Sequence, residues 1–337
     1  MLSSFFMKEK IKISVVISTW NRIEILLKIL ESFKYQTIDK KIFEIIICDS
    51  FSKDGTDKAI NKFKLENIDI NILYTNIKKN ILASKRNHGI NLSNGEIVVL
   101  IDDDCLPNNF FLETYLKEFK NLDEKIILNG VVDYPESYMK KSNYLKYRKS
   151  RHFQNDKYDN NRDFKLEADK IVAMNMAFKK SKAISETKYF NEEFLGYGFE
   201  DYDFGWRLIK AGFQLKKSSA KIIHMELGSN FLGYLKKFYH LGRDGMNNLI
   251  KINYDAAQNS VYFKIESNKF AIFFMKYLIF LKFFKFMEKI IAKLEKMPYF
   301  YTPLFYRLAL TSAYIRGCAD REKALDNLKK INKGWYN

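Results

Sequence analysis

The first hundred residues alternate between short apolar runs and amphipathic stretches. Four runs rich in β-branched residues lie at 11–19, 43–50, 70–76 and 96–103. Nearly continuous apolar character is typical of strands that are buried on both faces. The stretches between these runs have helical spacing of their apolar residues, in 22–33, 55–66 and 81–93. This alternation predicts βαβ units, and hence an α/β fold in which helices flank a mostly parallel sheet.

Further along the chain, apolar periodicity predicts a helix over 108–121 and strands over 125–134 and 170–180. Another helix is predicted over 199–213, with acidic residues in its first turn, where the helix dipole favours negative charge. The intervening stretch 136–165 is polar, basic and rich in tyrosine. It predicts a long connection of the kind that forms a lid or a binding loop.

Polar side chains follow three of the predicted strands, at the point where each strand ends. Thr19, Asn21 and Arg22 follow the first strand, Asp49 follows the second, and Asp102 to Asp104 follow the fourth. Open α/β sheets bind ligands outside the carboxyl ends of their strands, so these groups predict a binding edge. The sequence contains neither GxGxxG after the first strand nor GxxxxGK[ST], which argues against a dinucleotide-dependent oxidoreductase and a P-loop enzyme.

Three adjacent carboxylates end the fourth predicted strand, in the sequence LIDDDC. Like charges at the end of a buried strand repel one another and resist burial, so we expect a cation beside them. If the strand geometry continues, Asp102 and Asp104 project to one side and Asp103 to the other. A D-x-D pair suits Mg²⁺ or Mn²⁺, which take oxygen ligands and keep positions open for phosphate. The alternative is a solvated loop or a helix cap.

Two other polar clusters have both a functional and a structural interpretation. Asp49 and Asp54 lie in a predicted turn, where aspartate is common without any function. Lys85, Arg86 and Asn87 lie on a predicted helix, from which they either reach phosphate groups or form a solvated face.

The order and spacing of these motifs resemble the family 2 glycosyltransferases of the GT-A fold. The resemblance covers about residues 11–230 and rests on four segments: VVISTWNR, ICDSFSKDGT, ASKRNHGINLSNGEIVVLIDDDC and FLGYGFEDYDFGWRL. It implies that Thr19 and Asp49 line a nucleoside pocket, and that Asp102 and Asp104 hold Mn²⁺ or Mg²⁺ against the diphosphate of a nucleotide-sugar. The residues expected around the donor are Thr19, Asn21, Arg22, Asp49, Lys85, Arg86, Asn87, Asp102 and Asp103. UDP is the family's commonest carrier.

The segment GYGFEDYDFGWRL looks like the acceptor-side segment of this family and of galactosyl- and N-acetylgalactosaminyl-transferases. The resemblance implies that Asp201 is the catalytic base and that Glu200 orients the acceptor hydroxyls. A helix N-terminus holds a carboxylate ionised, which suits a base. We expect Asp203 to cap or solvate the same turn. His224 is either a structural hydrogen-bonding residue or, as in related transferases, a further metal ligand.

The chain departs from the family pattern at Asp49, because Ser50 follows it where many relatives carry a second acidic residue. This affects the recognition of the base and leaves the diphosphate site unchanged. We therefore expect an inverting glycosyltransferase of the hexosyltransferase class, acting on a hydroxyl of a glycan or lipid-linked acceptor. Inversion requires a single in-line displacement without a covalent intermediate.

The formal charge of +17 is concentrated in the last third of the chain. From Leu235 to Asn337 there are 19 lysines and arginines against eight acidic residues, an excess of +11. We expect a GT-A catalytic domain over 1–235 and a basic, aromatic helical region over 236–337. Within the latter, 269–296 is strongly apolar, but lysines interrupt it before it reaches the roughly 18 to 20 residues that span a bilayer.

On a continuous helix, one broad stripe of that segment carries Phe270, Phe273, Phe274, Tyr277, Leu278, Leu281 and Phe284, with Lys282, Lys285 and Lys289 beside it. This pattern predicts a helix lying on an anionic membrane surface, and so an enzyme on the cytoplasmic, inner face of the cell membrane. The alternative is a helical subdomain packed on the catalytic domain. The stretch 306–317 is expected to pack in that way in either case.

Composition constrains the class of protein further. Three widely spaced cysteines form neither a CxxC pair nor a disulfide framework, which favours a reducing compartment. The N-terminus lacks the pattern of a secretory signal. The alternatives to an enzyme are a catalytically inactive nucleotide-sugar-binding scaffold and a basic nucleic-acid-binding protein. The acidic strand ends argue against nucleic acid as a partner.

Overall fold

The sheet contains all six predicted strands and two more. The computed structural model describes residues 10–152, 167–226, 230–280, 282–295, 297 and 301–323. The four strands of the N-terminal half are β1 (Ile13–Thr19), β2 (Phe43–Asp49), β3 (Asn71–Asn76) and β4 (Ile97–Asp102). The later strands are β5 (Cys105–Pro107), β6 (Ile126–Asp133), β7 (Asn175–Lys179) and β8 (Gln214–His224).

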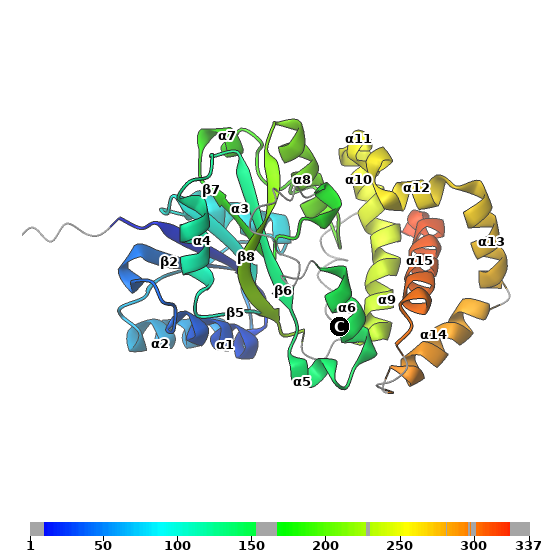
Figure 1. Ribbon diagram of the computed structural model, residues 1–337, viewed down its shortest axis with the longest axis horizontal. Coiled ribbons are helices and arrows are strands. Elements are labelled where there is room, and N and C mark those ends of the chain that lie inside the picture. The colour runs from blue at the N-terminus through cyan, green and yellow to red at the C-terminus, as the bar shows by residue number, and fades with distance from the viewer. Residues whose placement is uncertain are drawn as a thin grey trace, which may run out of the picture.

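The eight strands form one sheet in the order β3-β2-β1-β4-β7-β6-β8-β5. The first four strands pair in parallel, as expected of βαβ units. β7 is antiparallel to both β4 and β6, and β5 is antiparallel to β8. The sheet is therefore mixed (Figure 1): β3, β2, β1 and β4 form a parallel half, and β6 and β8 pair in parallel in the other half.

Helices cover both faces of the sheet because successive strand residues point to opposite sides. On one face, Val15 and its alternate neighbours pack against α1 (Ile23–Phe33), α2 (Thr56–Glu66) and α4 (Phe111–Phe119). On the other face, Val16 belongs to a core shared with α3 (Leu82–Leu92), α7 (Lys182–Ser185) and α8 (Glu200–Lys210). This arrangement is the predicted α/β fold, and it resembles that of GT-A proteins.

The stretch 136–152 is helical, so the prediction of a long connection over 136–165 was wrong for its described part. It contains α5 (Glu136–Met139) and α6 (Asn143–Arg151). The Ser142 hydroxyl accepts a hydrogen bond from the Leu145 N–H and so caps α6. Short 3₁₀ turns lie at Lys40–Ile42, Ala168–Lys170 and Arg321–Lys323. The remainder of the predicted connection, 153–166, lies outside the described residues.

The last third is a group of helices at one end of the molecule (Figure 1). They are α9 (Phe231–His240), which continues as a π-helical turn over Leu241–Gly245, then α10 (Met246–Ile252), α11 (Tyr254–Asn259), α12 (Val261–Ser267), α13 (Lys269–Phe280), α14 (Phe283–Leu294) and α15 (Pro303–Ala319). Residue 235, the predicted domain boundary, lies within α9. In the described part of the chain, every helix is too short or too polar to cross a bilayer.

The segment 269–296 forms two helices rather than the continuous helix assumed in the sequence analysis. Lys282 has a left-handed backbone (φ 58°) and stands between α13 and α14. A left-handed residue ends regular helical geometry, so a single stripe does not extend across both helices. Leu281 lies outside the described residues. The expected packing of 306–317 is confirmed, because Tyr306, Ala309 and Ala313 of α15 are buried.

Candidate active site

The carboxyl ends of β1, β2 and β4 lie side by side, as the sequence predicts. Thr19 is in register with Asp49 on β2, and Ser18 is in register with Asp102 on β4. The polar residues that follow these strands therefore gather at one edge of the sheet. Helices α3 and α8 and strand β8 bring further charged groups to the same edge.

Asp103 and Asp104 share the guanidinium group of Arg22. Arg22 donates from Nη1 to Asp103 and from Nη2 to Asp104, both at 2.8 Å. The Thr19 hydroxyl also donates to Asp103, at 2.8 Å. β4 ends at Asp102, so the two following aspartates lie in a turn. The expectation that strand alternation turns Asp103 away from Asp104's partners was wrong for this reason.

Asp104 meets His224 where β5 pairs with β8. Cys105 is in register with His224 in the antiparallel pair, and His224 Nε2 lies 3.3 Å from Asp104 Oδ1. Among the described residues, ligand atoms of Asp104, Cys105 and His224 lie within 4.8 Å of one another. The buried Nδ1 of His224 has no hydrogen-bond partner in that part of the chain. Burial by itself raises the pKa of Asp104, but His224 and Arg22 outweigh it and lower that pKa overall.

The chemistry of this cluster fits a hard divalent cation. Asp104 supplies an ionised carboxylate and His224 an imidazole, which suit Mn²⁺ or Mg²⁺. Mn²⁺ and Mg²⁺ prefer oxygen ligands to sulfur, so the Cys105 thiol is a poor ligand for them. Asp102, the other expected ligand, is not part of this three-residue cluster.

Arg86 joins the strand end to the acceptor-side segment. Its Nη2 donates to Asp102 (3.2 Å), and its Nη1 donates to Asp201 (2.8 Å) and approaches Glu200 (3.5 Å). Only 5% of its side chain is exposed, and its guanidinium lies 5.2 Å from the ring centroid of Phe190. A buried arginine needs such partners because an unpaired buried charge is costly. Its burial among carboxylates excludes the alternative of a solvated helix face for Arg86.

Glu200 and Asp201 form the first turn of α8, behind a bend in the backbone. Gly196, Gly198 and Phe199 all have positive φ, and the bend directs both carboxylates toward Arg86. Asp201 also accepts a hydrogen bond from the Ala173 N–H (2.9 Å). Burial raises the pKa of Asp201 although Arg86 opposes it. Burial, together with the charge of Asp201, raises the pKa of Glu200 to about 7.

Asp203 neither caps the helix nor is solvated, contrary to expectation. It is buried, with 1% of its surface exposed, and it accepts hydrogen bonds from Arg207 Nε and Asn253 Nδ2. Arg207 in turn donates to the backbone carbonyls of Thr187 and Tyr189. Asp203 therefore fixes the position of α8, and the neighbouring Glu200 and Asp201 remain the groups available for chemistry.

Lys85 and Asp49 lie at the β1–β2 side of the edge. Lys85 is buried and donates from Nζ to the Thr19 carbonyl and to Asn80, both at 3.0 Å. Burial lowers its pKa to about 8. Asp49 accepts hydrogen bonds from Ser50, Ser52 and Tyr74. These contacts hold the ends of β1, β2 and β3 together.

Asn21 and Asn87 have structural partners. Asn21 has positive φ (51°), and its Oδ1 accepts from the Lys53 N–H (2.6 Å), which ties the loop after β1 to the loop after β2. The Asn87 amide donates to the Phe190 carbonyl and accepts from the Phe190 N–H. Asn87 therefore connects α3 to the segment before α8, and its amide is engaged away from Asp49.

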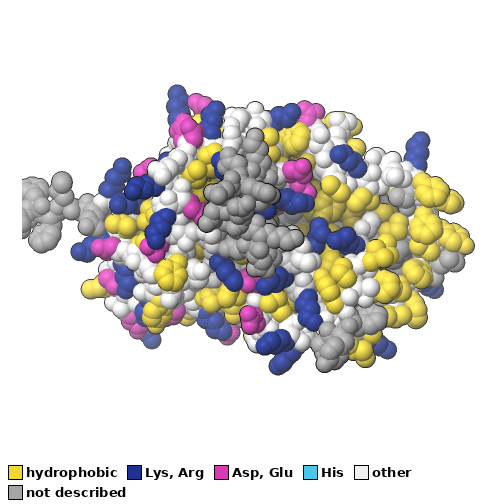
Figure 2. All heavy atoms as spheres, in the orientation of Figure 1, with side chains coloured by type: hydrophobic (Ala, Val, Ile, Leu, Met, Phe, Trp, Pro, Cys, Tyr) yellow, Lys and Arg dark blue, Asp and Glu magenta, His cyan; other side chains and the backbone are white. Residues whose placement is uncertain are grey.

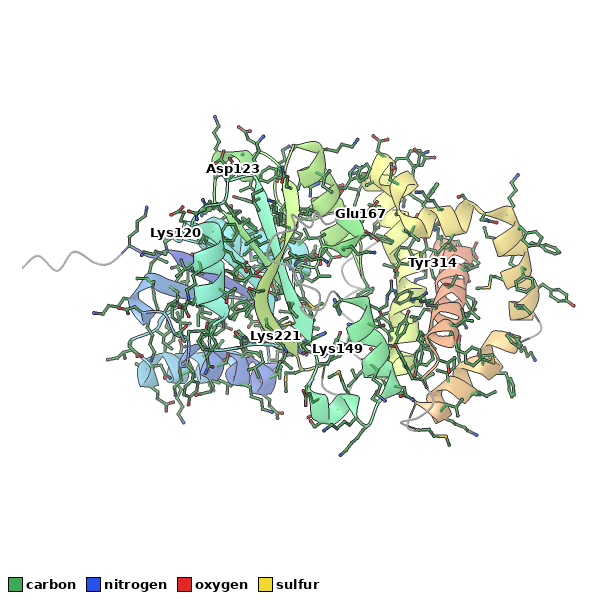
Figure 3. The ribbon with its side chains drawn as sticks, viewed as in Figure 1. Lys120, Asp123, Lys149, Glu167, Lys221 and Tyr314 are labelled. Carbon is green, nitrogen blue, oxygen red and sulfur yellow. The ribbon has the colours of Figure 1, made fainter. Side chains whose placement is uncertain are left out.

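A second charged cluster beside His224 was not predicted. Glu226 lies 4.0 Å from His224 Nδ1 and is contacted by Arg148 Nε (3.3 Å), by the Tyr144 hydroxyl (3.1 Å) and by Lys237 Nζ (4.0 Å). Near it, Lys149 and Lys221 both pair with Asp133, and Figure 3 shows these two lysines on α6 and β8. The only sequence signals were the basic stretch 136–165 and an acidic residue two positions after His224.

A mixed α/β sheet with an acidic strand end facing an acidic helix N-terminus defines a glycosyltransferase of the GT-A class, and comparisons agree. The family model for "Glycosyl transferase family 2" matches residues 14–183, half of the chain, so the chain belongs to that family. A second model, for the "N-terminal domain of galactosyltransferase", matches residues 156–228. That match covers the segment with Glu200 and Asp201 and confirms the predicted similarity.

Curated relatives are also glycosyltransferases. The chain is 26% identical over 264 residues to "Uncharacterized glycosyltransferase YfnE" of Bacillus subtilis, covering 65% of this chain and 66% of that protein. It is 28% identical over 185 residues to a GalNAc(5)-diNAcBac-PP-undecaprenol beta-1,3-glucosyltransferase of Campylobacter jejuni (55% and 56%). It is 28% identical to chondroitin synthase of Escherichia coli (59% and 32%). The matches thus span about a third to two thirds of these relatives' lengths.

Solved structures establish the fold. A mannosyltransferase from Pyrobaculum calidifontis, in complex with GDP-Man and Mn²⁺, superposes with a TM-score of 0.58 at 14% identity, covering 92% of this chain and 86% of that chain. GalNAc-T7 with UDP, GalNAc and Mn²⁺ superposes with a TM-score of 0.53 at 14% identity, covering 76% and 50%. The predicted GT-A fold with C-terminal helices is confirmed.

Proposed function

We propose that this glycosyltransferase is an inverting enzyme, which moves a hexose from a nucleotide-diphosphate sugar to a hydroxyl of a glycan or lipid-linked acceptor. One observation carries the proposal: Arg86 links Asp102, at the end of the donor-binding strand, to Glu200 and Asp201 on the acceptor side. The distances of 2.8 to 3.5 Å from Arg86 to these carboxylates support a site in which the donor and acceptor groups share one cation.

The donor side uses the strand end. Asp104 and His224 are the residues proposed to hold Mn²⁺ or Mg²⁺, and an ion held there would supply positive charge against the departing diphosphate. Arg22, which contacts Asp103 and Asp104, is placed to hold a diphosphate oxygen. Asp102 orients the Arg86 side chain through their ion pair. We propose UDP as the nucleotide, with Thr19, Asp49 and Lys85 forming the walls of its pocket.

The acceptor side uses the first turn of α8. Asp201 takes the proton of the acceptor hydroxyl while that oxygen forms a bond to the anomeric carbon and the carbon–phosphate oxygen bond breaks. Attack from the face opposite the leaving diphosphate inverts the configuration. Glu200 accepts hydrogen bonds from neighbouring acceptor hydroxyls. Arg86 keeps the two carboxylates in position without neutralising them by proton transfer, because a guanidinium group does not lose its proton.

The C-terminal helices are proposed to bring the enzyme to an anionic membrane surface, on the inner face of the cell membrane. Phe270 and Phe273 of α13 are 81% and 73% exposed, and Phe286 of α14 is 62% exposed. Aromatic residues with flanking lysines suit the headgroup region of a bilayer. We further propose that residues 1–235 carry the chemistry and that 236–337 carry this attachment.

The test is a panel of nucleotide-sugars incubated with the purified whole chain, with Mn²⁺, with Mg²⁺ and with a chelator. We expect one donor to be hydrolysed or transferred only when the metal is present, and the same donor to raise the melting temperature. If a donor raises the melting temperature but is not turned over when acceptors are supplied, the protein is a binding scaffold. Stabilisation by single-stranded nucleic acid and by no nucleotide-sugar would overturn the proposal.

A further inference from the structure

The C-terminal helices enclose an apolar cavity that lies outside the candidate active site. Its volume is about 800 Å³, within the range of small-molecule binding sites. Helices α12 to α15 contribute its walls, which include Ile265, Phe274, Met275, Leu278, Leu308 and Ile315. Met275 and Ile315 are buried, whereas Phe274 and Leu308 are 53% and 42% exposed. The cavity thus has an apolar interior and reaches the surface.

The surface around this cavity is also apolar. Phe270, Phe273, Tyr277, Phe286 and Leu304 are each more than half exposed and do not line the cavity. Figure 2 shows hydrophobic side chains gathered at the end of the molecule where α13 and α14 lie in Figure 1. Contiguous apolar surface of this kind marks an interaction site, because exposing it to water is unfavourable.

The charges on this surface are one-sided. Its carboxylates are paired internally: Glu266 binds Arg321 and Glu288 binds Arg316. Lys264, Lys269, Lys276, Lys289 and Lys293 are exposed, and within the described residues none of them is paired with a carboxylate. Lys264 lines the cavity, and the other four lysines stand on α13 and α14, which contribute to its walls.

We propose that this cavity binds the hydrocarbon chain of an anionic phospholipid, whose headgroup phosphate contacts the surrounding lysines. A second copy of the chain is disfavoured as the occupant, because an isologous contact would oppose two surfaces of the same positive charge. Nucleic acid matches the lysines but gains nothing from an apolar interior. A phospholipid supplies both chemistries at once. The inference extends the proposed membrane attachment and names its ligand.

The test uses a phospholipid that is soluble as a monomer, so that membrane adsorption does not contribute. The whole chain is titrated with dihexanoyl phosphatidylglycerol below its micellar concentration, by calorimetry. We expect saturable binding, weakened at least about tenfold for dihexanoyl phosphatidylcholine, whose headgroup carries no net charge. Glycerophosphoglycerol, the headgroup alone, is expected not to bind measurably. Absence of binding by the wild-type chain overturns the proposal.

Two variants locate the bound chain. Thr311 lines the cavity on α15, and Thr311→Phe fills part of it. We expect at least about a tenfold loss of affinity for Thr311→Phe and less than about a twofold change for Leu65→Ser, whose exposed side chain lies on α2. Equal binding by the wild-type chain and Thr311→Phe places the lipid elsewhere and overturns the assignment.

Thermal unfolding and donor turnover are measured on the same samples. They separate this proposal from the proposed function, because a chain that binds lipid without turning over a donor contradicts only the latter. If Thr311→Phe lowers the melting temperature, the wild-type response to the three soluble ligands still decides the proposal.

Discussion

The three adjacent aspartates have different partners, although they are chemically identical and consecutive. Asp102 pairs with Arg86, Asp103 with Thr19 and Arg22, and Asp104 with Arg22 and His224. The strand ends at Asp102, so the backbone turn sends each side chain in its own direction. Their separate roles follow from this turn, and a substitution at each position is expected to have a different effect.

Asp104→Asn is expected to weaken Mn²⁺ binding by at least about 10²-fold, because outer-shell partners of a metal alone account for 10- to 100-fold. Asp103→Asn is the matched control, since it makes the same change one residue earlier and leaves Asp104 and His224 intact. Mn²⁺ affinity is measured by electron paramagnetic resonance in the presence of nucleotide diphosphate. Equal affinity in the two variants would show that the metal binds elsewhere.

Asp201→Asn is expected to keep donor binding and to lose transfer by about 10² to 10⁴, the usual contribution of a positioned base. The amide is nearly isosteric and does not accept the proton. Asp203→Asn is the control two residues away. It weakens the buried hydrogen bonds to Arg207 and Asn253, so we expect a loss of about 1 to 3 kcal/mol in stability with turnover largely retained.

If Asp201→Asn transfers sugar within a few-fold of the parent rate, the base lies elsewhere and Glu200 is the first candidate. If Asp203→Asn loses transfer at full stability, the roles of the two aspartates are reversed. Single-turnover rates and thermal melts on the same preparations distinguish these outcomes.

Glu200 is expected to give the reaction a pH dependence below neutrality. Its pKa is raised to about 7 by burial and by the charge of Asp201. A hydroxyl-orienting carboxylate works when ionised, so acceptor use increases as the pH rises through the pKa and declines below it. The decline is therefore expected as the pH falls through about 7. In Glu200→Gln, kcat/KM for the acceptor should not show this decline at low pH. If kcat/KM of this variant still declines at low pH, the ionisation belongs to another group.

At the scale of elements, helices α9 and α15 cross closely because glycines stand at the contact. A Cβ at Gly317 of α15 would lie 2.0 Å from the Tyr239 carbonyl oxygen, and one at Gly242 would lie 2.1 Å from that of Tyr314. Figure 3 shows Tyr314 on α15, next to α9. These contacts are with backbone atoms, which cannot rotate away. The crossing holds α15 against α9 within the group of C-terminal helices.

Gly317→Ala is therefore expected to destabilise the chain by about 1 to 3 kcal/mol, as overpacking does. Gly233→Ala is the matched control, because Gly233 lies in the first turn of α9 and its nearest neighbour, the side chain of Asn230, is 3.6 Å away. There alanine is expected to be neutral or to stabilise by up to about 1 kcal/mol, since it favours helix. Chemical denaturation checks both. Equal stability of the two variants would contradict the close crossing.

At the scale of the molecule, the C-terminal helices combine a buried inner side with an apolar outer surface. Tyr306, Ala309 and Ala313 of α15 share the main core with Tyr147 of α6. Removing the chain beyond residue 265 would therefore strip part of that core, so point substitutions test membrane binding more cleanly than truncation. The outer surface of α13 offers such positions, because Phe270 and Phe273 project into solvent.

The double variant Phe270→Ser, Phe273→Ser is expected to lose most sedimentation with anionic liposomes, because it removes the exposed aromatic rings and keeps every lysine. Leu65→Ser and Ile68→Ser together are the control. These residues are 80% and 87% exposed beside the catalytic sheet. Sedimentation of the wild-type chain should weaken at high salt as headgroup contacts are screened. A wild-type chain that remains in the supernatant at low salt contradicts the attachment.

The sequence by itself determined the parallel half of the sheet and the residues at its edge. β1 to β4 fall within two residues of the predicted runs, because strands buried on both faces need continuous apolar side chains and turns interrupt them visibly. Asp49, Asp102 to Asp104 and the acidic turn of α8 were found for a related reason. They are charged groups at the ends of strands and helices, where the local sequence pattern also indicates the position in the fold.

Only the tertiary structure decided which charges meet. Arg86 pairs with Asp102 and Asp201 across 16 and 115 residues, and no local pattern predicts a partner at such separation. The sequence did not predict helix α6, because its buried residues include polar side chains and do not form a simple apolar stripe. The sequence did not predict the break at Lys282, because lysine has no preference for the left-handed backbone that it adopts there. Local periodicity indicates which side of a helix or strand is buried. The pairing of charges and the crossing of helices depend on distant residues that pack against that helix or strand.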